Sequence, residues 1–371
     1  MMKKQRILVS VFFALMIFSF FNICSAEDVK VEFLLFKNEN DKTYDLNIVF
    51  PDGLYEYYTN KNHRILEASD FSSFVTPYIF EPVADKIWEL YDNEEDFVNG
   101  VLMIVHQIDY EETEPIKYPI ETMVEGKGDC DLFSLIAASV VKAGGLDVVL
   151  LYYEQQAHMN IGVNLSSKPQ DAREDVCYVT YENTQYYMAE CTGGNWMEGW
   201  RIGECPPNLK DVSVEVISLD KVEQGVPGQA SASFSSLESS TLVLEITPQI
   251  CLQNTDITIR GILSPSFGNQ NVTIYASVNN SPWIEIDKVI TNENGFFQLL
   301  WNNEFTGIVS FRASWPGNNE YASSLSTTKT TTVVPIIAIM LFGSILLGII
   351  GISIALVLKK SQNEEIQPEY W

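Results

Sequence analysis

The sequence predicts an α+β domain followed by an all-β domain. Helical patterns dominate the first part of the chain, and the last of them, Cys130 to Lys142, repeats apolar residues at helical spacing. Segments with strand character follow it, an order typical of an α+β fold rather than of alternating βα units. From Leu242 to Val334 the pattern consists of short alternating runs separated by Gly, Pro and Asn. That spacing predicts a β-sandwich.

A strand pair is predicted before the first helix. Val29 to Phe36 and Tyr44 to Phe50 alternate or run apolar, and polar turn residues bound them. The period changes at Glu81, where apolar residues recur at helical spacing and Pro82 suits a first turn. A second helix is predicted from Glu94 to Gln107.

The third helix, Cys130 to Lys142, is stopped by Gly144 and Gly145. Four strands are predicted to follow it, at Asp147 to Tyr153, Met159 to Leu165, Val176 to Tyr181 and Gln185 to Cys191. A segment rich in Ser, Gly and Pro, from Val222 to Thr241, reads as a linker to the sandwich. Thr327 to Thr332 is predicted to be a threonine-rich stalk.

Two apolar segments predict an exported, membrane-anchored protein. The first 26 residues join a basic start to an apolar stretch and a small-residue end before Glu27, which is typical of a secretory signal peptide; an uncleaved anchor is the alternative. Pro335 to Leu358 carries no charge, is long enough to span a bilayer, and is followed by Lys359 and Lys360. We therefore expect a single-pass type I protein in the cell membrane.

These observations divide the chain into seven expected parts. They are a signal peptide (1–26), an N-terminal β-rich segment (27–80), the main α+β domain (81–221), a linker (222–241), a β-sandwich (242–333), a transmembrane helix (334–358) and a cytoplasmic tail (359–371).

Composition excludes several function classes. The 371 residues carry a formal net charge of -26, whereas nucleic-acid binding needs a basic surface. The sequence has no clustered histidines, no paired CxxC, no phosphate loop and no dinucleotide motif. We therefore expect no nucleic-acid partner, no metal and no cofactor.

Five of the six cysteines follow the signal peptide. In an oxidising compartment an odd number leaves at least one unpaired. Cys177 is expected to pair with Cys191 or Cys205, and the sequence does not choose between them. Sequons at Asn164 and two positions in the sandwich, Asn271 and Asn279, are compatible with an external location.

Cys130 is the strongest candidate for a reactive side chain. It stands where the glycine-bearing segment 126–129 meets a helix start, and free backbone N–H groups with the positive end of the helix dipole stabilise a thiolate there. The thiolate is the nucleophilic form of cysteine. A small buried residue or a disulfide partner is the alternative interpretation of Cys130.

A cysteine nucleophile needs a base and a group that orients the base. The chain has three histidines, and His158 lies between two predicted strands that follow the helix. Glu190 ends a later strand among apolar neighbours, where a carboxylate is costly unless it is paired. His158 and Glu190 are therefore the candidate base and orienting group.

Six short segments between Ile104 and Pro207 carry a further signal. They are Val105-His106-Gln107 with Tyr110, Tyr118 to Met123, Gly128 to Asp131, Ala157-His158-Met159, Tyr186 to Gly193, and Trp200 to Glu204 with Pro206. In this order they resemble the motifs of the transglutaminase-like superfamily, in the form found in archaeal and bacterial exported proteins. The sandwich similarly resembles the immunoglobulin-like repeats of archaeal surface proteins.

The resemblance implies a papain-like core with a nucleophile helix packed on an antiparallel sheet. It implies that Cys130 is the nucleophile, His158 the general base and acid, Glu190 the orienting carboxylate, and Gln107 a side-chain donor to an oxyanion. The sequence departs from the family at Leu132, which replaces an acidic residue, and near the site at Ala157 and Cys191.

Two functions are compatible with these features. The first is a cysteine hydrolase or acyltransferase that acts on peptide or protein amide bonds at the cell surface through a thioester. The second is a catalytically inactive binding or surface-layer module with the same fold. The reactivity of the Cys130 thiol distinguishes the two.

Overall fold

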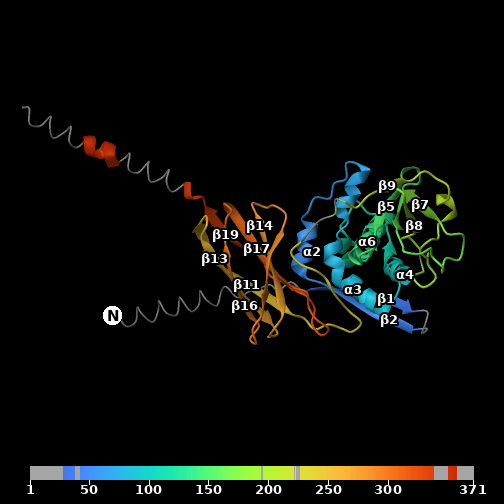
Figure 1. The fold of residues 1–371 in the computed structure, drawn as a ribbon, viewed down its shortest axis with the longest axis horizontal. Coiled ribbons are helices and arrows are strands. Elements are labelled where there is room, and N and C mark those ends of the chain that lie inside the picture. Colours follow the sequence, from blue (N-terminus) through green and yellow to red (C-terminus); the bar gives the residue numbers. More distant parts are fainter. Residues whose placement is uncertain are drawn as a thin grey trace, which may run out of the picture.

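The computed structural model describes residues 28–37, 42–193, 195–220, 222, 226–337 and 350–356. Helices and strands mix in the first part, and the second part is all-β, so the predicted α+β class is confirmed at this level. In Figure 1 the two parts form adjacent lobes, and α2 lies on the side of the first lobe that faces the sandwich.

Two sheets and a set of helices build the first lobe. One antiparallel sheet has the order β1-β2-β10, formed by β1 (Val29–Lys37), β2 (Lys42–Phe50) and β10 (Ser231–Ser233). The helices are α2 (Asp52–Thr59), η2 (Ala68–Phe74), η3 (Pro77–Phe80), α3 (Glu81–Leu90), α4 (Glu94–Val105), α5 (Pro119–Glu125) and α6 (Cys130–Ala143). The predicted first strand pair and the three predicted helices are thereby confirmed.

The second sheet of this lobe is antiparallel and has the order β7-β8-β6-β5-β9. Its strands are β5 (Val148–Tyr153), β6 (His158–Val163), β7 (Tyr178–Tyr181), β8 (Thr184–Ala189) and β9 (Glu215–Ile217). Short elements complete the lobe: β3 (Asp109–Tyr110) pairs in parallel with β4 (Lys127–Gly128), and η4 (Glu154–Gln156) and η5 (Pro207–Leu209) are single 3₁₀ turns.

Helix α6 is the centre of this lobe. Every residue from Leu132 to Val141 is buried, because the helix packs on β5 and β6 on one side and on α4, α5 and η3 on the others. A helix that is apolar on nearly all sides is stable only in such an enclosed position. Burial of α6 fixes the place of its first residue, Cys130.

The sequence predicted a separate N-terminal β-rich segment (27–80), but the N-terminal strands belong to the α+β lobe. Apolar side chains of β1 and β2, including Leu35 and Leu46, belong to the same buried cluster as the side chains of α6. The boundary predicted at residue 80 therefore lies inside one hydrophobic core.

The predictions of a linker at 222–241 and of a threonine-rich stalk at Thr327 to Thr332 are also wrong. Ser231–Ser233 forms β10 and pairs with β2, and Val226 and Ala230 are buried, so much of 222–241 belongs to the first lobe. The threonine-rich segment forms β19 (Lys329–Val334), which pairs with a neighbouring strand on each side. Threonine is β-branched and fits a strand as readily as a stalk.

Two sheets face each other in the second lobe. One has the order β11-β13-β16, with β11 (Thr241–Thr247), β13 (Asp256–Ser264) and β16 (Phe296–Asn302). The other has the order β12-β19-β17-β14-β15, with β12 (Ile250–Leu252), β14 (Asn271–Val278), β15 (Ile284–Ile290) and β17 (Gly307–Trp315); β18 (Ser324–Leu325) pairs with β17. Their inward side chains form one buried cluster, as the predicted sandwich requires.

The two lobes contact each other directly. The hydroxyl of Tyr78 hydrogen-bonds that of Tyr275, and Arg312 Nη1 donates to the carbonyl oxygen of Gly53 over 2.9 Å. Leu325 of the sandwich packs against the core of the first lobe. These contacts hold the sandwich against the α+β lobe.

The predicted signal peptide and cytoplasmic tail lie outside the described residues, as does most of the predicted span at 334–358. Within the ranges that the structure describes, no helix has both the length and the apolar character needed to cross a membrane.

The cysteines fall into different surroundings. Cys177 and Cys205 belong to one apolar cluster, and the amide of Cys177 donates to Gly203 O over 2.8 Å. Burial and the adjacent Cys177 thiol raise the pKa of Cys205 to about 12. Cys191 is fully buried in the other core, next to Ser134. All five described cysteines are free thiols in the structure. Of the two pairings left open by the sequence, Cys177 with Cys205 is the one whose thiols lie in the same cluster.

We predict that oxidised glutathione, a disulfide donor, converts these two thiols into a Cys177–Cys205 disulfide in the full-length protein. The two thiols lose two protons and two electrons, and the donor is reduced. Peptide mapping by mass spectrometry without reductant should find this link and an unmodified Cys191. The disulfide should raise the free energy of unfolding by about 2–4 kcal/mol, an effect absent from Cys177→Ser. A Cys177–Cys191 link would contradict the prediction.

Candidate functional site

Three elements bring Cys130, His158 and Glu190 together. Cys130 is the first residue of α6, His158 is the first residue of β6, and Glu190 directly follows β8. Strands β6 and β8 are neighbours, with Ile161 opposite Ala189, and α6 packs on β6. The site is therefore assembled at one end of the sheet by the start of the buried helix.

The three side chains form a hydrogen-bonded chain. His158 Nε2 lies 2.9 Å from Glu190 Oε2 and 3.2 Å from Oε1. His158 also hydrogen-bonds the side chain of Cys130, whose Sγ lies 3.8 Å from the carbonyl oxygen of Ala157. Because Nε2 faces the carboxylate, Nδ1 is the ring nitrogen left for the thiol. The imidazole thus bridges the sulfur and the carboxylate.

Glu190 is completely buried but well supplied with donors. Its Oε1 accepts hydrogen bonds from the Thr192 amide (2.9 Å) and hydroxyl (2.6 Å), and its Oε2 accepts one from Asn160 Nδ2 (3.2 Å). Burial alone would raise the pKa of this carboxyl, but His158 and Thr192 outweigh it, and the pKa of Glu190 is lowered. Glu190 is therefore ionised at neutral pH.

The pKa of His158 shifts in the opposite direction to that of Glu190. Burial disfavours its charged form, but hydrogen bonds to Cys130 and Glu190 and the charge of Glu190 more than offset this. The pKa of His158 rises to about 10, so the ring is an imidazolium at neutral pH. An imidazolium between a sulfur and a carboxylate is the arrangement that supports a thiolate nucleophile.

Asn160 and Thr192 are site residues that the sequence analysis did not identify. Asn160 is completely buried on β6, two residues after His158, and therefore on the same face of the strand. Thr192 follows Glu190 by two residues and binds it through both its amide and its hydroxyl. Polar residues two positions from a buried ionisable group are the sequence signal that points to such partners.

The first turn of α6 carries two carboxyl groups. Asp129 caps the helix and its Oδ2 accepts a hydrogen bond from the Thr113 amide (3.0 Å). Burial, together with the hydrogen bond and charge of Asp129, raises the pKa of Asp131 to about 8. Asp131 is therefore protonated at neutral pH and shares its proton with Asp129, which removes one negative charge from the surroundings of Cys130.

Gln107 does not join the other three candidates. Its Nε2 donates to the carbonyl oxygens of Leu34 (2.9 Å) and Met103 (2.8 Å), and its Oε1 accepts from the Leu34 amide (2.8 Å). One amide hydrogen and the amide oxygen bind β1, and the other hydrogen bonds a carbonyl oxygen of α4. The oxyanion role expected for Gln107 is therefore wrong in this structure, because no hydrogen remains for it to donate.

His106 supports the site from behind. Its Nε2 lies 3.0 Å from the carbonyl oxygen of Glu190, and burial lowers the pKa of the ring despite this contact. The neutral ring therefore donates to that carbonyl from Nε2. His106 helps to fix the backbone at Glu190 but does not contact its carboxylate.

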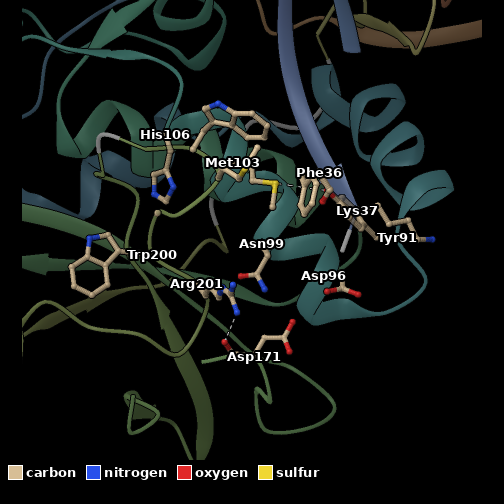
Figure 2. Close-up of a pocket in the computed structure, with 13 residues that line it drawn as sticks. Phe36, Lys37, Tyr91, Asp96, Asn99, Met103, His106, Asp171, Trp200 and Arg201 are labelled. Atoms are coloured by element: carbon tan, nitrogen blue, oxygen red, sulfur yellow. Dashed lines mark hydrogen bonds between the residues drawn. The ribbon is translucent and has the colours of Figure 1, made fainter. Parts of the chain in front are cut away.

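A small pocket of about 80 Å³ lies on one side of His106. In Figure 2 the side chains of Met103, Asn99 and Arg201 surround it, and Arg201 donates to the carbonyl oxygen of Asp171 over 2.9 Å. Its volume is well below the roughly 300 Å³ of the smaller ligand sites. It is too small to receive a peptide.

A larger cavity of about 480 Å³ lies next to the first turn of α6. It is lined by Glu32, Phe33, Val105, His106, Gln107, Ile108, Asp109, Tyr110, Phe133, Gly193 and Trp196. Phe133 follows Cys130 by three residues, and Gly193 follows Glu190 by three. None of the three triad side chains lines this cavity, but its wall begins one helical turn from Cys130 and three residues from Glu190. Among the described residues, no three His, Cys, Asp or Glu side chains cluster in a way that could hold a metal ion.

Comparison with known proteins does not assign the chain to a family. No family model matches it, and no curated protein matches it. Solved structures with a limited similarity to part of it include a CBM33 polysaccharide monooxygenase (10% identity, TM-score 0.19, 24% of this chain and 60% of that one). Another is the sulfur carrier protein SoxY from Chlorobium limicola f thiosulfatophilum (12% identity, TM-score 0.20, 27% and 86%). A third is an engineered protein (13% identity, TM-score 0.19, 25% and 20%). Similarities this low carry no argument about the function.

We predict that Glu190→Gln lowers the pKa of His158. Removal of the carboxylate charge leaves only Cys130 to oppose burial, which favours the neutral ring, and the pKa should fall by about 1 to 3 pH units. The measurement is an NMR pH titration of the full-length protein labelled with ¹³C at histidine, with His158→Asn to assign the resonance. Thr192→Val, which removes a donor and keeps the charge, should change the pKa less. An unchanged titration in Glu190→Gln would show that this carboxylate does not hold the imidazolium.

Proposed function

We propose that this protein is a transglutaminase-like cysteine hydrolase that acts on amide bonds of peptides or proteins. The observation that carries the proposal is the hydrogen-bonded chain from Cys130 through His158 to Glu190. The order of the six motifs along the sequence adds to it, as does a nucleophile helix packed on an antiparallel sheet. A papain-like core is proposed for the α+β lobe on the same grounds.

Acyl transfer follows from this geometry. The Cys130 thiolate attacks the amide carbonyl carbon, and a backbone N–H at the start of α6 donates to the oxyanion. His158 then gives its proton to the leaving amine as the C–N bond breaks, which leaves a thioester on Cys130. In the second half the neutral imidazole takes a proton from water as the water oxygen attacks the thioester carbonyl. The C–S bond then breaks, which releases the carboxylic acid product and restores the Cys130 thiolate beside the His158 imidazolium. Glu190 keeps the ring oriented and balances its charge throughout.

Hydrolysis is proposed over crosslinking because water is the default acceptor for a thioester. The sandwich is proposed to be immunoglobulin-like and to hold the catalytic lobe outside the cell membrane. The apolar segments at both ends of the sequence support this location. Substrates would then be peptides or proteins at the cell surface.

The proposal predicts that Cys130 reacts rapidly with iodoacetamide below pH 7. The thiolate is the form that iodoacetamide alkylates, and an imidazolium beside the sulfur stabilises it. Alkylation of the full-length protein is followed by mass spectrometry across pH 5 to 9. His158→Asn should slow the reaction of Cys130 at pH 6 by roughly tenfold or more, since the free thiol then sets the thiolate fraction.

The matched control is Cys177 in the reduced protein, where it is a partly exposed free thiol. Its alkylation should not change in His158→Asn. If Cys130 reacts no faster than Cys177 below pH 7, or is recovered as a disulfide, the enzyme proposal fails. The chain would then be better described as an inactive binding or surface-layer module.

A further inference from the structure

We propose that the 480 Å³ cavity beside α6 is a specificity subsite for a lysine or arginine side chain of the substrate. This inference rests on the proposed function and extends it to a substrate class. The bound cation is a recognition element and not the reacting group.

Position supports the assignment. The cavity wall includes Phe133, one helical turn after Cys130, and Gly193, just beyond the loop that fixes Glu190. Tyr110, another wall residue, pairs along β3 with Gly128 of the nucleophile segment. A side chain next to the bond under attack would lie in this cavity.

The walls suit an apolar stem. Phe33, Phe133 and Trp196 line the cavity, and the rings of Tyr110 and Phe133 meet edge to face with centroids 6.2 Å apart. Aromatic faces bind aliphatic chains by burial and attract a cation through their negative π-faces. The long stems of lysine and arginine combine both properties.

The charges of the cavity have one sign. Glu32 and Asp109 line it, both are exposed, and neither forms an ion pair within the described part of the chain. No lysine or arginine is among the described lining residues, and the neutral ring of His106 adds no positive charge. An acidic side chain would be repelled here, and a neutral apolar one would leave both carboxylates without a partner. A positively charged occupant satisfies them.

The test uses peptides that differ in one side chain. The peptides are acetyl-Ala-X-Ala-amides with X as lysine, arginine, norleucine or glutamate, and binding is read as protection of Cys130 in the full-length protein from iodoacetamide. Lysine and arginine should protect at roughly tenfold lower concentration than norleucine, and glutamate should protect least. The advantage should shrink in high salt. Equal protection by lysine and norleucine would overturn the subsite.

Variants of Asp109 and Glu32 test whether these two carboxylates cause the preference for lysine. Asp109→Asn and Glu32→Gln should each reduce the preference for lysine over norleucine, since each removes one of the two negative charges of the cavity. Glu245→Gln is the matched control, since Glu245 is an exposed carboxylate on the sandwich. A preference that survives in Asp109→Asn/Glu32→Gln would place the recognition elsewhere and overturn the assignment.

Binding to the unreactive Cys130→Ala variant separates the two proposals. Its affinity for the same peptides is measured by tryptophan fluorescence, which requires no thiol. If Cys130 proves unreactive but this variant still prefers lysine and arginine, the proposed function fails and the cation subsite stands. If Cys130 is reactive and this variant shows no preference, the subsite fails and the proposed function stands.

Discussion

The buried charge of Glu190 is the constraint on which the site depends. A carboxylate with no solvent contact costs several kcal/mol unless it is paired and hydrogen-bonded. Here the donors are the imidazolium of His158, the amide of Asn160, and the amide and hydroxyl of Thr192. Because these donors come from β6 and from the loop after β8, satisfying one charge fixes both segments and the orientation of the histidine ring between them.

The position of Cys130 relative to His158 is fixed by the packing of α6 on the sheet. Helix α6 is buried over nearly its whole length, so its N-terminus is held at one place relative to the sheet. The hydroxyl of Ser134 lies 2.7 Å from Cys130 O and 3.0 Å from Met159 O, which ties the first turn of the helix to β6. The sulfur and the imidazole are therefore aligned by backbone elements and not by flexible loops. Preorganisation of this kind is what acyl transfer requires of its nucleophile and base.

The sequence predicted those features that depend on local pattern. Helical and strand periods gave the main elements, and short motifs gave Cys130, His158 and Glu190. It failed where the outcome depends on residues distant in the chain. The side chain of Gln107 donates a hydrogen bond to the backbone of Leu34, which lies 73 positions away, and no local pattern near Gln107 predicts this bond. Ser231–Ser233 carries no apolar alternation, yet it completes a sheet because the edge of β2 is available to it.

The distribution of charge connects the site with the acidic character of the chain. Protonation of Asp131 removes one of two negative charges at the start of α6, and His158 contributes a positive one. In the proposed mechanism the thiolate and Glu190 still outnumber that imidazolium, and Glu32 and Asp109 add to the negative potential next to them. A cationic substrate side chain in the cavity would reduce this potential as negative charge moves from the sulfur to the oxyanion. Recognition and charge balance would then come from the same contact, which is a physical reason for an acidic subsite beside a thiolate.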